Sequence, residues 1–314
     1  MKVGTSEHTR EAYGKTLIEL GRADRDIVVL DADLSSSTQT CMFAKEFPDR
    51  FFNVGVAEQN LMGMSAGFAL AGKTVFTSAF AMFGAGRAWE QIRNTIAYDQ
   101  LNVKIVLTHA GITVGKDGAS HQIVEDLALM RVIPGMKVQV PADAAETRAM
   151  IRAAAQYQGP VYIRLTREKV PRVFDIYDYD TDKPITIRDG TDVTLMACGY
   201  MLAETIEAAA ELHKEGISAR IINMHTIKPL HTETVVKAAR ETGAIVTCEE
   251  HSIIGGLGGA VAEALSENYP APLRRIGIRD LFGKSGDAKD LMIRYNLKAT
   301  DIVKAAKDAI KAKR

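Results

Sequence analysis

One loop of the sequence concentrates side chains that can transfer protons and bind anions. It is the segment THAGITVGKDGASHQ at residues 108–122, which holds His109, Asp117 and His121 among three glycines. Two imidazoles and a carboxylate after a strongly apolar strand are typical of an active site, and they outweigh the alternative of a merely flexible polar loop. A zinc site is a weaker interpretation, because the histidines lie twelve positions apart and no third imidazole is near them in the sequence.

A second candidate is Glu58, which opens an otherwise apolar helix predicted at residues 58–70. An acidic residue here also complements the positive end of the helix dipole, and helix rules alone favour that structural role over catalysis. Its setting favours function, because Gln59 and Asn60 are the only other polar residues before a long hydrophobic face. A carboxyl group held in such a low-dielectric place becomes a useful proton carrier.

Aromatic and cationic residues supply further candidates. Phe80 and Phe83 follow a predicted strand, and such a pair either packs in a core or forms a wall against a flat heterocycle. Arg10, Arg93 and Arg167 each lie at the end of a predicted element. Taken singly, each arginine is best interpreted as a solvated or ion-paired side chain.

Alternating strand and helix patterns position these candidates. Short βα units predict parallel sheets covered on both faces, with ligands bound beyond the carboxyl ends of the strands. The predicted fold class is therefore α/β, with two consecutive doubly wound, mainly parallel sheet domains. Strands are predicted at 27–30, 74–77, 103–107, 137–140, 161–165, 193–197, 219–224, 244–248 and 274–278, and helices at 10–21, 58–70, around 88–96, 124–130, from 143, 202–214, 232–240, 257–268, 287–295 and 301–311.

The length of 314 residues predicts about two domains. Residues 168–190 have no helical period and carry two prolines and many charges, so they are interpreted as the interdomain linker. The first domain is predicted over residues 1–180 and the second over residues 190–314.

Composition excludes several classes of protein. Lys and Arg total 39, as do Asp and Glu, so the net charge is zero and gives no electrostatic footprint for nucleic acid or a membrane surface. Any anion site must be local, and association with other subunits meets little net repulsion. Three cysteines without a CxxC spacing favour a reducing cytoplasm, and no apolar run is long enough to span a membrane.

Four motifs together resemble the C-terminal half of transketolase, an enzyme that transfers ketol units with thiamine diphosphate. They are DADLSSS at 31–37, NVGVAEQ at 53–59, SAFAMF at 78–83 and the 108–122 loop. The resemblance covers nearly the whole chain. It implies a pyrimidine-binding domain followed by the transketolase C-terminal domain, and transfer of a two-carbon ketol unit between sugar phosphates.

The resemblance implies cofactor-binding roles for four residues. Glu58 matches the glutamate that contacts the aminopyrimidine ring nitrogen of thiamine diphosphate, where proton exchange activates the cofactor. Phe80 and Phe83 match the aromatic pocket around that ring, and Asp33 falls in the cofactor-proximal loop. The family often has a third aromatic residue where this chain has Gly84-Ala85-Gly86, so the pocket is expected to be more open there.

The resemblance also implies substrate-binding positions. Asp117 matches a residue that reads a sugar hydroxyl, and His121 matches a catalytic residue near the substrate oxygen at the reacting carbon. Arg93 matches an arginine close to the substrate. The phosphate of the sugar phosphate is expected to bind guanidinium, hydroxyl and imidazole groups at Arg10, Ser37, His109 and Arg167.

A missing motif predicts a partner chain. The family binds diphosphate and metal through Gly-Asp-Gly, and the nearest string here is Gly286-Asp287-Ala288. The resemblance therefore implies a split transketolase whose N-terminal subunit supplies the diphosphate site with its Mg²⁺ or Ca²⁺, while this chain holds no metal. Two copies of each chain are expected to form a heterotetramer with cofactors at the interfaces.

Alternative functions share parts of the pattern. Deoxyxylulose phosphate synthase has a similar glycine-rich loop but usually an arginine in place of His109. The beta subunit of oxo-acid dehydrogenases has this domain pair and length but lacks the THxGxTxGxDGxxHQ string. A non-catalytic scaffold subunit is the alternative from another class, and the presence of Glu58, His109, Asp117 and His121 argues against it.

Overall fold

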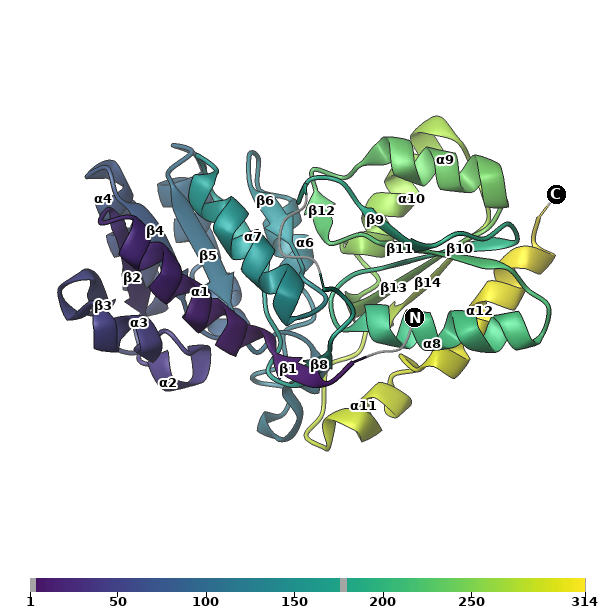
Figure 1. Cartoon of the computed structure of the whole chain (residues 1–314), viewed down its shortest axis with the longest axis horizontal. Helices are drawn as coiled ribbons and strands as arrows, with labels where there is room; N and C mark the ends of the chain where they lie inside the picture. The colour runs from purple at the N-terminus through teal and green to yellow at the C-terminus, as the bar shows by residue number, and fades with distance from the viewer. Residues whose placement is uncertain (1–3, 176–179, 314) are drawn as a thin grey trace.

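The computed structural model describes residues 4–175 and 180–313. Figure 1 shows two α/β domains side by side, the first at the left and the second, in green and yellow, at the right. Each is built on a mainly parallel sheet, which confirms the predicted fold class. Residues 1–3 and 314 of the predicted domains, and residues 176–179 of the predicted linker, lie outside the described residues.

The first domain contains a seven-stranded sheet in the order β12-β6-β7-β5-β4-β2-β3, in which only the β12–β6 pair is antiparallel. Its strands alternate buried side chains between two faces, as in Val28 and Val29 of β2. One face packs against α1 and α7, and the other packs against α4, η3 and α6. The strands are β2 (Ile27–Asp31), β3 (Phe51–Asn53), β4 (Thr74–Ser78), β5 (Val103–Leu107), β6 (Lys137–Gln139), β7 (Val161–Arg164) and β12 (Thr226–Lys228).

Short elements complete this domain. Beside the sheet, β1 pairs antiparallel with β8, a strand inside the predicted linker. The helical elements and this pair are α1 (Thr9–Ala23), α2 (Ser35–Thr38), α3 (Cys41–Glu46), η1 (Pro48–Arg50), α4 (Glu58–Leu70), η2 (Met82–Arg87), α5 (Trp89–Gln91), η3 (Ile92–Ala97), η4 (Ile112–Asp117), α6 (Asp126–Arg131), α7 (Ala144–Gln156), β1 (Ser6–His8) and β8 (Lys169–Pro171).

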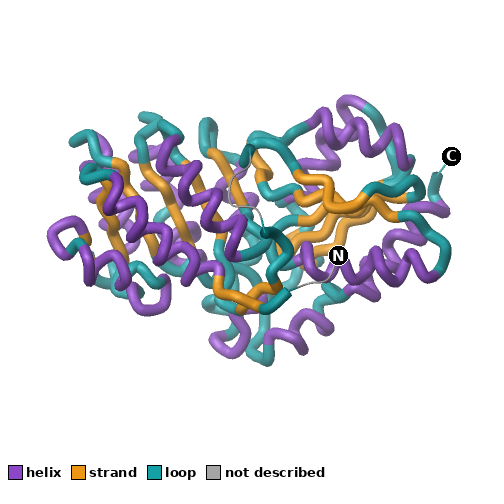
Figure 2. Tube along the Cα trace, in the orientation of Figure 1, coloured by secondary structure: helices purple, strands orange, loops and turns teal. Residues whose placement is uncertain are grey.

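The second domain contains a five-stranded sheet in the order β14-β13-β10-β11-β9, with β9 antiparallel to β11. Figure 2 shows its strands as a layer with helices on both sides. Helices α8 and α12 cover one face, while α9 and α10 cover the other. The elements are β9 (Ile185–Arg188), β10 (Val193–Ala197), α8 (Met201–Lys214), β11 (Ala219–Asn223), α9 (Thr232–Thr242), β13 (Ile245–Ser252), α10 (Leu257–Asn268), β14 (Leu273–Ile278), α11 (Ala288–Arg294) and α12 (Ala299–Lys311).

Two features differ from the sequence-based expectations. The predicted linker contains β8 and β9, and β12 leaves the second domain to pair with β6 of the first. Strands of three or four residues are too short for a period of two to be recognised. The helix expected around residues 88–96 is regular only in α5, because the wide π-helical turns η2 and η3 flank it, and a 3.6-residue period cannot report such turns.

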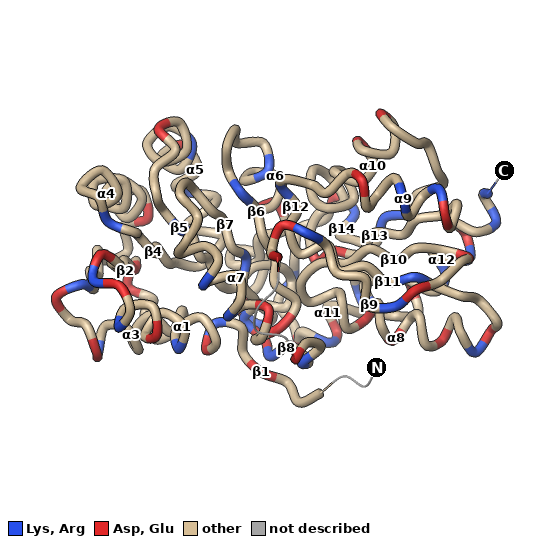
Figure 3. Tube along the Cα trace, turned by 45° about the horizontal axis from the view of Figure 1, so that its top comes forward, with Lys and Arg blue, Asp and Glu red and all other residues tan. Residues whose placement is uncertain are grey.

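Acidic and basic residues are spread over both domains (Figure 3). This even distribution agrees with the zero net charge. An anion must therefore bind to a local group of basic side chains rather than to a large basic surface. No helix in residues 4–175 and 180–313 is long and apolar enough to cross a membrane.

We expect Asp143→Ala to lower the free energy of unfolding by about 3 kcal/mol. The buried carboxylate of Asp143 caps α7 through the backbone N–H of Glu146, at 2.8 Å, as the sequence predicts. Its second oxygen accepts from the backbone N–H groups of Val173 and Phe174, so the substitution leaves three buried donors without an acceptor. Chemical denaturation measures the loss. Asp287→Ala, which removes an exposed cap from α11, is the control and should cost about 1 kcal/mol or less; equal losses would contradict the prediction.

Candidate functional site

The candidate residues lie on loops that leave one edge of the first sheet. Strands β7, β5, β4 and β2 are parallel neighbours, so their carboxyl ends meet at that edge. Each of these strands is followed by candidates. They are Asp33 and Ser37 after β2, Phe80 and Phe83 after β4, the 108–122 loop after β5, and Arg167 after β7.

Two phenylalanine rings and two imidazole rings pack together at this edge. The ring of Phe80 stacks on that of His109, with 3.8 Å between centroids, and lies 6.3 Å from that of Phe83. The ring of Phe83 in turn meets that of His121 edge-on at 5.1 Å. The residues expected to contact the cofactor and the histidines expected to contact the substrate therefore form one continuous surface.

His109 is held in a restricted conformation. Its backbone has a φ of 60°, a left-handed value that is uncommon outside glycine and is often found at functional sites. The side chain is buried, and its Nδ1 lies 2.8 Å from the hydroxyl of Thr108. Burial, followed by the positive charges of Arg10 and Arg167, lowers the pKa of His109 to about 3. The imidazole is therefore neutral near pH 7 and serves as a hydrogen-bonding group rather than a cation.

Arg10 and Arg167 converge beside this imidazole. The hydroxyl of Thr9 contacts that of Thr166 at 3.2 Å, which brings the start of α1 to the loop after β7. Thr9 is the first residue of α1, and His8 occupies the cap position. Burial, and then the nearby Arg167, lower the pKa of Arg10. Two guanidinium groups held close enough to affect each other are suited to a multiply charged anion.

Neighbouring polar groups orient the two arginines. Arg10 donates through Nη1 to the backbone oxygen of Ser37 at 2.8 Å. Arg167 donates to Glu168 at 2.9 Å, and its Nε lies 4.0 Å from a carboxylate oxygen of Asp117. The structure thus brings Arg10, Ser37, Arg167 and Asp117 to the same side of the site as His109.

Glu58 begins α4, as the sequence predicts, and the residue is only 2% exposed. The guanidinium of Arg87, on η2, lies 3.8 Å from Oε2 of this carboxylate. Oε2 is buried and accepts no hydrogen bond from the residues that the structure describes. A buried carboxylate oxygen that accepts no hydrogen bond fits a ligand that brings a ring N–H to this position.

Asp33 lies at the outer end of the site. Its φ of 63° is again left-handed, and its carboxylate accepts from the side-chain amide of Asn53 at 2.9 Å. Unlike Glu58 it is exposed, which leaves it accessible to a ligand or to a neighbouring subunit.

Sequence reasoning missed Asp31, which holds the loop that carries Ser37. Its buried carboxylate accepts from the backbone N–H of Leu34 and from the hydroxyls of Thr38 and Thr40, at 2.6 to 2.9 Å. Burial raises the pKa of Asp31 to about 6 against the effect of these hydrogen bonds. An acid at a strand end before a Ser/Thr-rich segment is the signal that identifies such a loop anchor.

Arg93 is not part of this group. It lies on η3, exposed, and its guanidinium donates to the side chain of the adjacent Asn94. Its role near a substrate stays a prediction.

Two domain models of known families match the chain. Residues 6–173 match the transketolase pyrimidine-binding domain, and residues 183–302 match the transketolase C-terminal domain. Their order along the chain is that of the two sheets, so the fold is that of the pyrimidine-binding and C-terminal domains of this class of protein.

Full-length relatives agree with these matches. The chain is 51% identical over 98% of both chains to a protein of Methanocaldococcus jannaschii described as a transketolase C-terminal section. It is 43% identical, over 99% of this chain and 98% of the other, to a 6-deoxy-6-sulfo-D-fructose transketolase subunit of Clostridium sp.. A solved structure described as a split-gene transketolase, an inactive β4 tetramer, matches 99% of this chain and all of that chain with a TM-score of 0.92 and 55% identity.

The chain belongs to the transketolase family. Within that family it corresponds to the section that forms a separate chain in the split-gene relative. Family membership implies dependence on thiamine diphosphate.

Proposed function

We propose that the chain is one subunit of a thiamine-diphosphate-dependent transketolase that transfers a two-carbon ketol unit between sugar phosphates. The observation that carries the proposal is the stack of Phe80 on His109, because it joins an aromatic wall for the cofactor to a cluster of phosphate-binding groups. Two relatives are described as subunits of transketolases for 6-deoxy-6-sulfo-D-fructose and for apulose 4-phosphate. These descriptions support ketol transfer between sugars as the reaction of this chain's complex.

Glu58, Phe80 and Phe83 would hold the aminopyrimidine ring of the cofactor. When bound, thiamine diphosphate supplies the carbon nucleophile that accepts and passes on the ketol unit. Oε2 of Glu58, which accepts no hydrogen bond from the described residues, would hold a proton at the ring nitrogen, and burial would strengthen that hydrogen bond. The two phenylalanine rings exclude water and fix the plane of the ring.

The remaining groups bind the substrate. Arg10 and Arg167 neutralise a phosphate dianion while the neutral imidazole of His109 hydrogen-bonds to it. Asp117 and His121, further along the 108–122 loop, face the sugar hydroxyl and the oxygen at the reacting carbon. Because His109, Asp117 and His121 lie on one loop, this loop contacts the substrate at both ends and supplies the orientation that group transfer needs.

A second subunit completes the site. The chain has no Gly-Asp-Gly motif for a diphosphate and its Mg²⁺ or Ca²⁺, so we place that site on an N-terminal transketolase subunit. The description of the similar split-gene chain as an inactive β4 tetramer supports the need for a partner. We expect two copies of each chain to assemble into a heterotetramer. Three free cysteines support a reducing, cytoplasmic location.

We expect this chain alone to bind thiamine diphosphate weakly and to show no ketol transfer. The diphosphate carries most of the cofactor's charge and needs a cation beside it, and we place that cation on the partner subunit. Calorimetry with and without the partner and Mg²⁺ should show tight binding only in the mixture, and transfer activity should appear in the same sample. Tight binding or activity of the isolated chain would overturn the split site.

A further inference from the structure

The 108–122 loop belongs to the first domain but is packed against the second. Ile112, in η4 of this loop, is fully buried in the hydrophobic cluster of the second domain, together with Leu195 and Val246 of its sheet. Val124, just after the loop, belongs to the same cluster. The loop is therefore supported from the second domain at its apolar positions.

A carboxylate of the second domain also reaches the backbone of this loop. Glu250, on β13, accepts the backbone N–H of Thr113 through Oε1 at 2.7 Å, and both residues are buried. The neighbouring Gly111 makes room for it, because a Cβ at this position would lie 2.2 Å from the same oxygen. Any side chain at residue 111 would displace the carboxylate.

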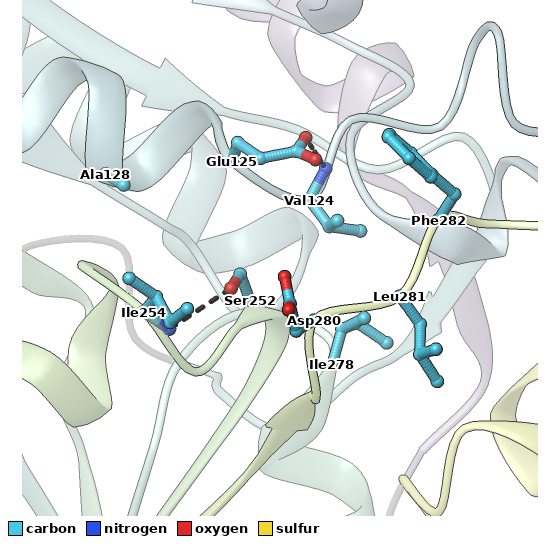
Figure 4. Close-up of a pocket in the computed structure, with 9 residues that line it drawn as sticks. All are labelled: Val124, Glu125, Ala128, Ser252, Ile254, Ile278, Asp280, Leu281 and Phe282. Atoms are coloured by element: carbon cyan, nitrogen blue, oxygen red, sulfur yellow. Dashed lines mark hydrogen bonds between the residues drawn. The ribbon is translucent and has the colours of Figure 1, made fainter.

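The end of β13 is fixed where the two domains meet. Buried Arg164 donates to the backbone oxygen of Glu250 at 2.9 Å and to the carboxylate of Asp126 at 2.8 Å. Two residues further on, the backbone N–H of Ser252 donates to the carbonyl of Val124 at 2.7 Å. Figure 4 shows this boundary, with Val124 opposite Ser252. The Glu250 carboxylate is thus presented to the loop from a rigid position.

A turn of the second domain makes a second contact with the loop. The side-chain amide of Gln122 donates to the carbonyls of Ile112 and Gly115 inside the loop and to that of Lys284 at 2.9 Å. The Ser285 hydroxyl donates to the carbonyl of Lys116 at 2.7 Å. Gly283 lies so close that a Cβ there would stand 1.8 Å from Oε1 of Gln122.

These contacts alternate with the proposed substrate residues. His109 precedes the Glu250 contact, while Asp117 lies between the Lys116 and Gln122 contacts and His121 is next to Gln122. We propose that the second domain positions the substrate-binding side chains of the 108–122 loop through Glu250 and the turn at residues 283–285. Glu250 is a positioning residue, since it acts through the backbone of Thr113. The inference rests on the proposed function for the identity of the substrate.

A matched pair of variants tests Glu250 in the assembled enzyme. Glu250→Gln keeps an acceptor oxygen for Thr113, whereas Glu250→Met keeps the chain length and removes the acceptor. We expect Glu250→Met to lower kcat/KM for a sugar phosphate by about 10- to 100-fold, the cost of leaving the buried backbone N–H of Thr113 without an acceptor. Glu250→Gln should stay within about threefold of the wild type, and the cofactor affinity should hold within about twofold in both.

Hydrogen exchange reports the contact without reference to activity. The amide of Thr113 should exchange about 10- to 100-fold faster in Glu250→Met than in the wild type, while peptides from α4 are unchanged. Glu249→Met is the control, because the adjacent Glu249 caps α10 through Leu257 and Gly258 instead of contacting the loop. Glu249→Met should lower the melting temperature. It should leave exchange at Thr113 and the ratio of kcat/KM to cofactor affinity unchanged.

Each outcome bears on the proposal. Equal losses in Glu250→Met and Glu249→Met, or unchanged exchange at Thr113, overturn it. If Glu250→Met does not fold, Gly283→Ala displaces Gln122 from the other side and should raise the sugar phosphate KM about tenfold; an unchanged KM also overturns the proposal. Absence of ketol transfer in the wild-type complex would instead refute the proposed function, while the exchange data would still report the contact between the domains.

Discussion

Glu58→Gln, assembled with the partner subunit, should lose at least about 10²- to 10⁴-fold in turnover. The substitution keeps the size of the side chain and its place at the start of α4, but the amide cannot exchange a proton with the cofactor ring. The carboxylate is buried and its Oε2 accepts no hydrogen bond from the described residues, so it is available to the cofactor ring, whereas the amide of Gln would offer no acid there. The loss should therefore appear in kcat rather than in the substrate KM.

Two measurements separate this loss from a folding defect. Circular dichroism should be unchanged, and hydrogen exchange at the thiazolium carbon of bound thiamine diphosphate, followed by NMR, should slow in parallel with turnover. Glu90→Gln is the matched control, since Glu90 is an exposed carboxylate near η3 that contacts only surface amides among the described residues. Normal exchange at the thiazolium carbon in Glu58→Gln would remove Glu58 from its proposed role.

Local patterns predict most of the elements that position the site. Strand β5 has the bounds predicted from its apolar run, and helix α4 has the bounds predicted from its helical period. Both elements bury a long apolar stretch, which makes the pattern easy to recognise. Phe80, His109 and Arg167 each follow a strand of the parallel sheet. Because the carboxyl ends of parallel strands meet at one edge, the sequence alone predicts that these three residues lie together. The rings of Phe80 and His109 stack there because their strands, β4 and β5, are neighbours.

Contacts between distant segments are what the sequence cannot give. Glu250 and Thr113 lie 137 positions apart, and neither periodicity nor composition relates them. In the sequence, Glu250 stands in an acidic pair that resembles a solvated turn, yet both members are buried and bonded to backbone N–H groups. Arg93 is the opposite case, because only the family resemblance suggested it, and its exposed contact with Asn94 leaves its place at the substrate a prediction.

Arg167→Ala should lower kcat/KM for phosphorylated sugars by about 10- to 100-fold and leave unphosphorylated donors such as hydroxypyruvate nearly unaffected. A charge-assisted hydrogen bond is worth about 1.5–3 kcal/mol, and Arg167 adds its permanent charge to that of Arg10. His109 cannot replace this charge, since the pKa of its imidazole is about 3 and the ring is neutral at neutral pH. The two guanidinium groups therefore carry nearly all of the discrimination between phosphorylated and unphosphorylated substrates.

The ratio of the two specificity constants is the quantity to measure, because a folding defect lowers both constants together. Arg10→Ala should change this ratio in the same direction, and Arg152→Ala should not, since Arg152 forms an exposed ion pair with Glu19 away from the site. Arg93→Ala then decides whether the site extends to η3: a change in the ratio would place Arg93 at the substrate despite its contact with Asn94. Unchanged ratios in both Arg167→Ala and Arg10→Ala would refute the phosphate site, and the oxo-acid dehydrogenase type of chemistry, which needs no phosphate on its substrate, would then explain this domain pair better.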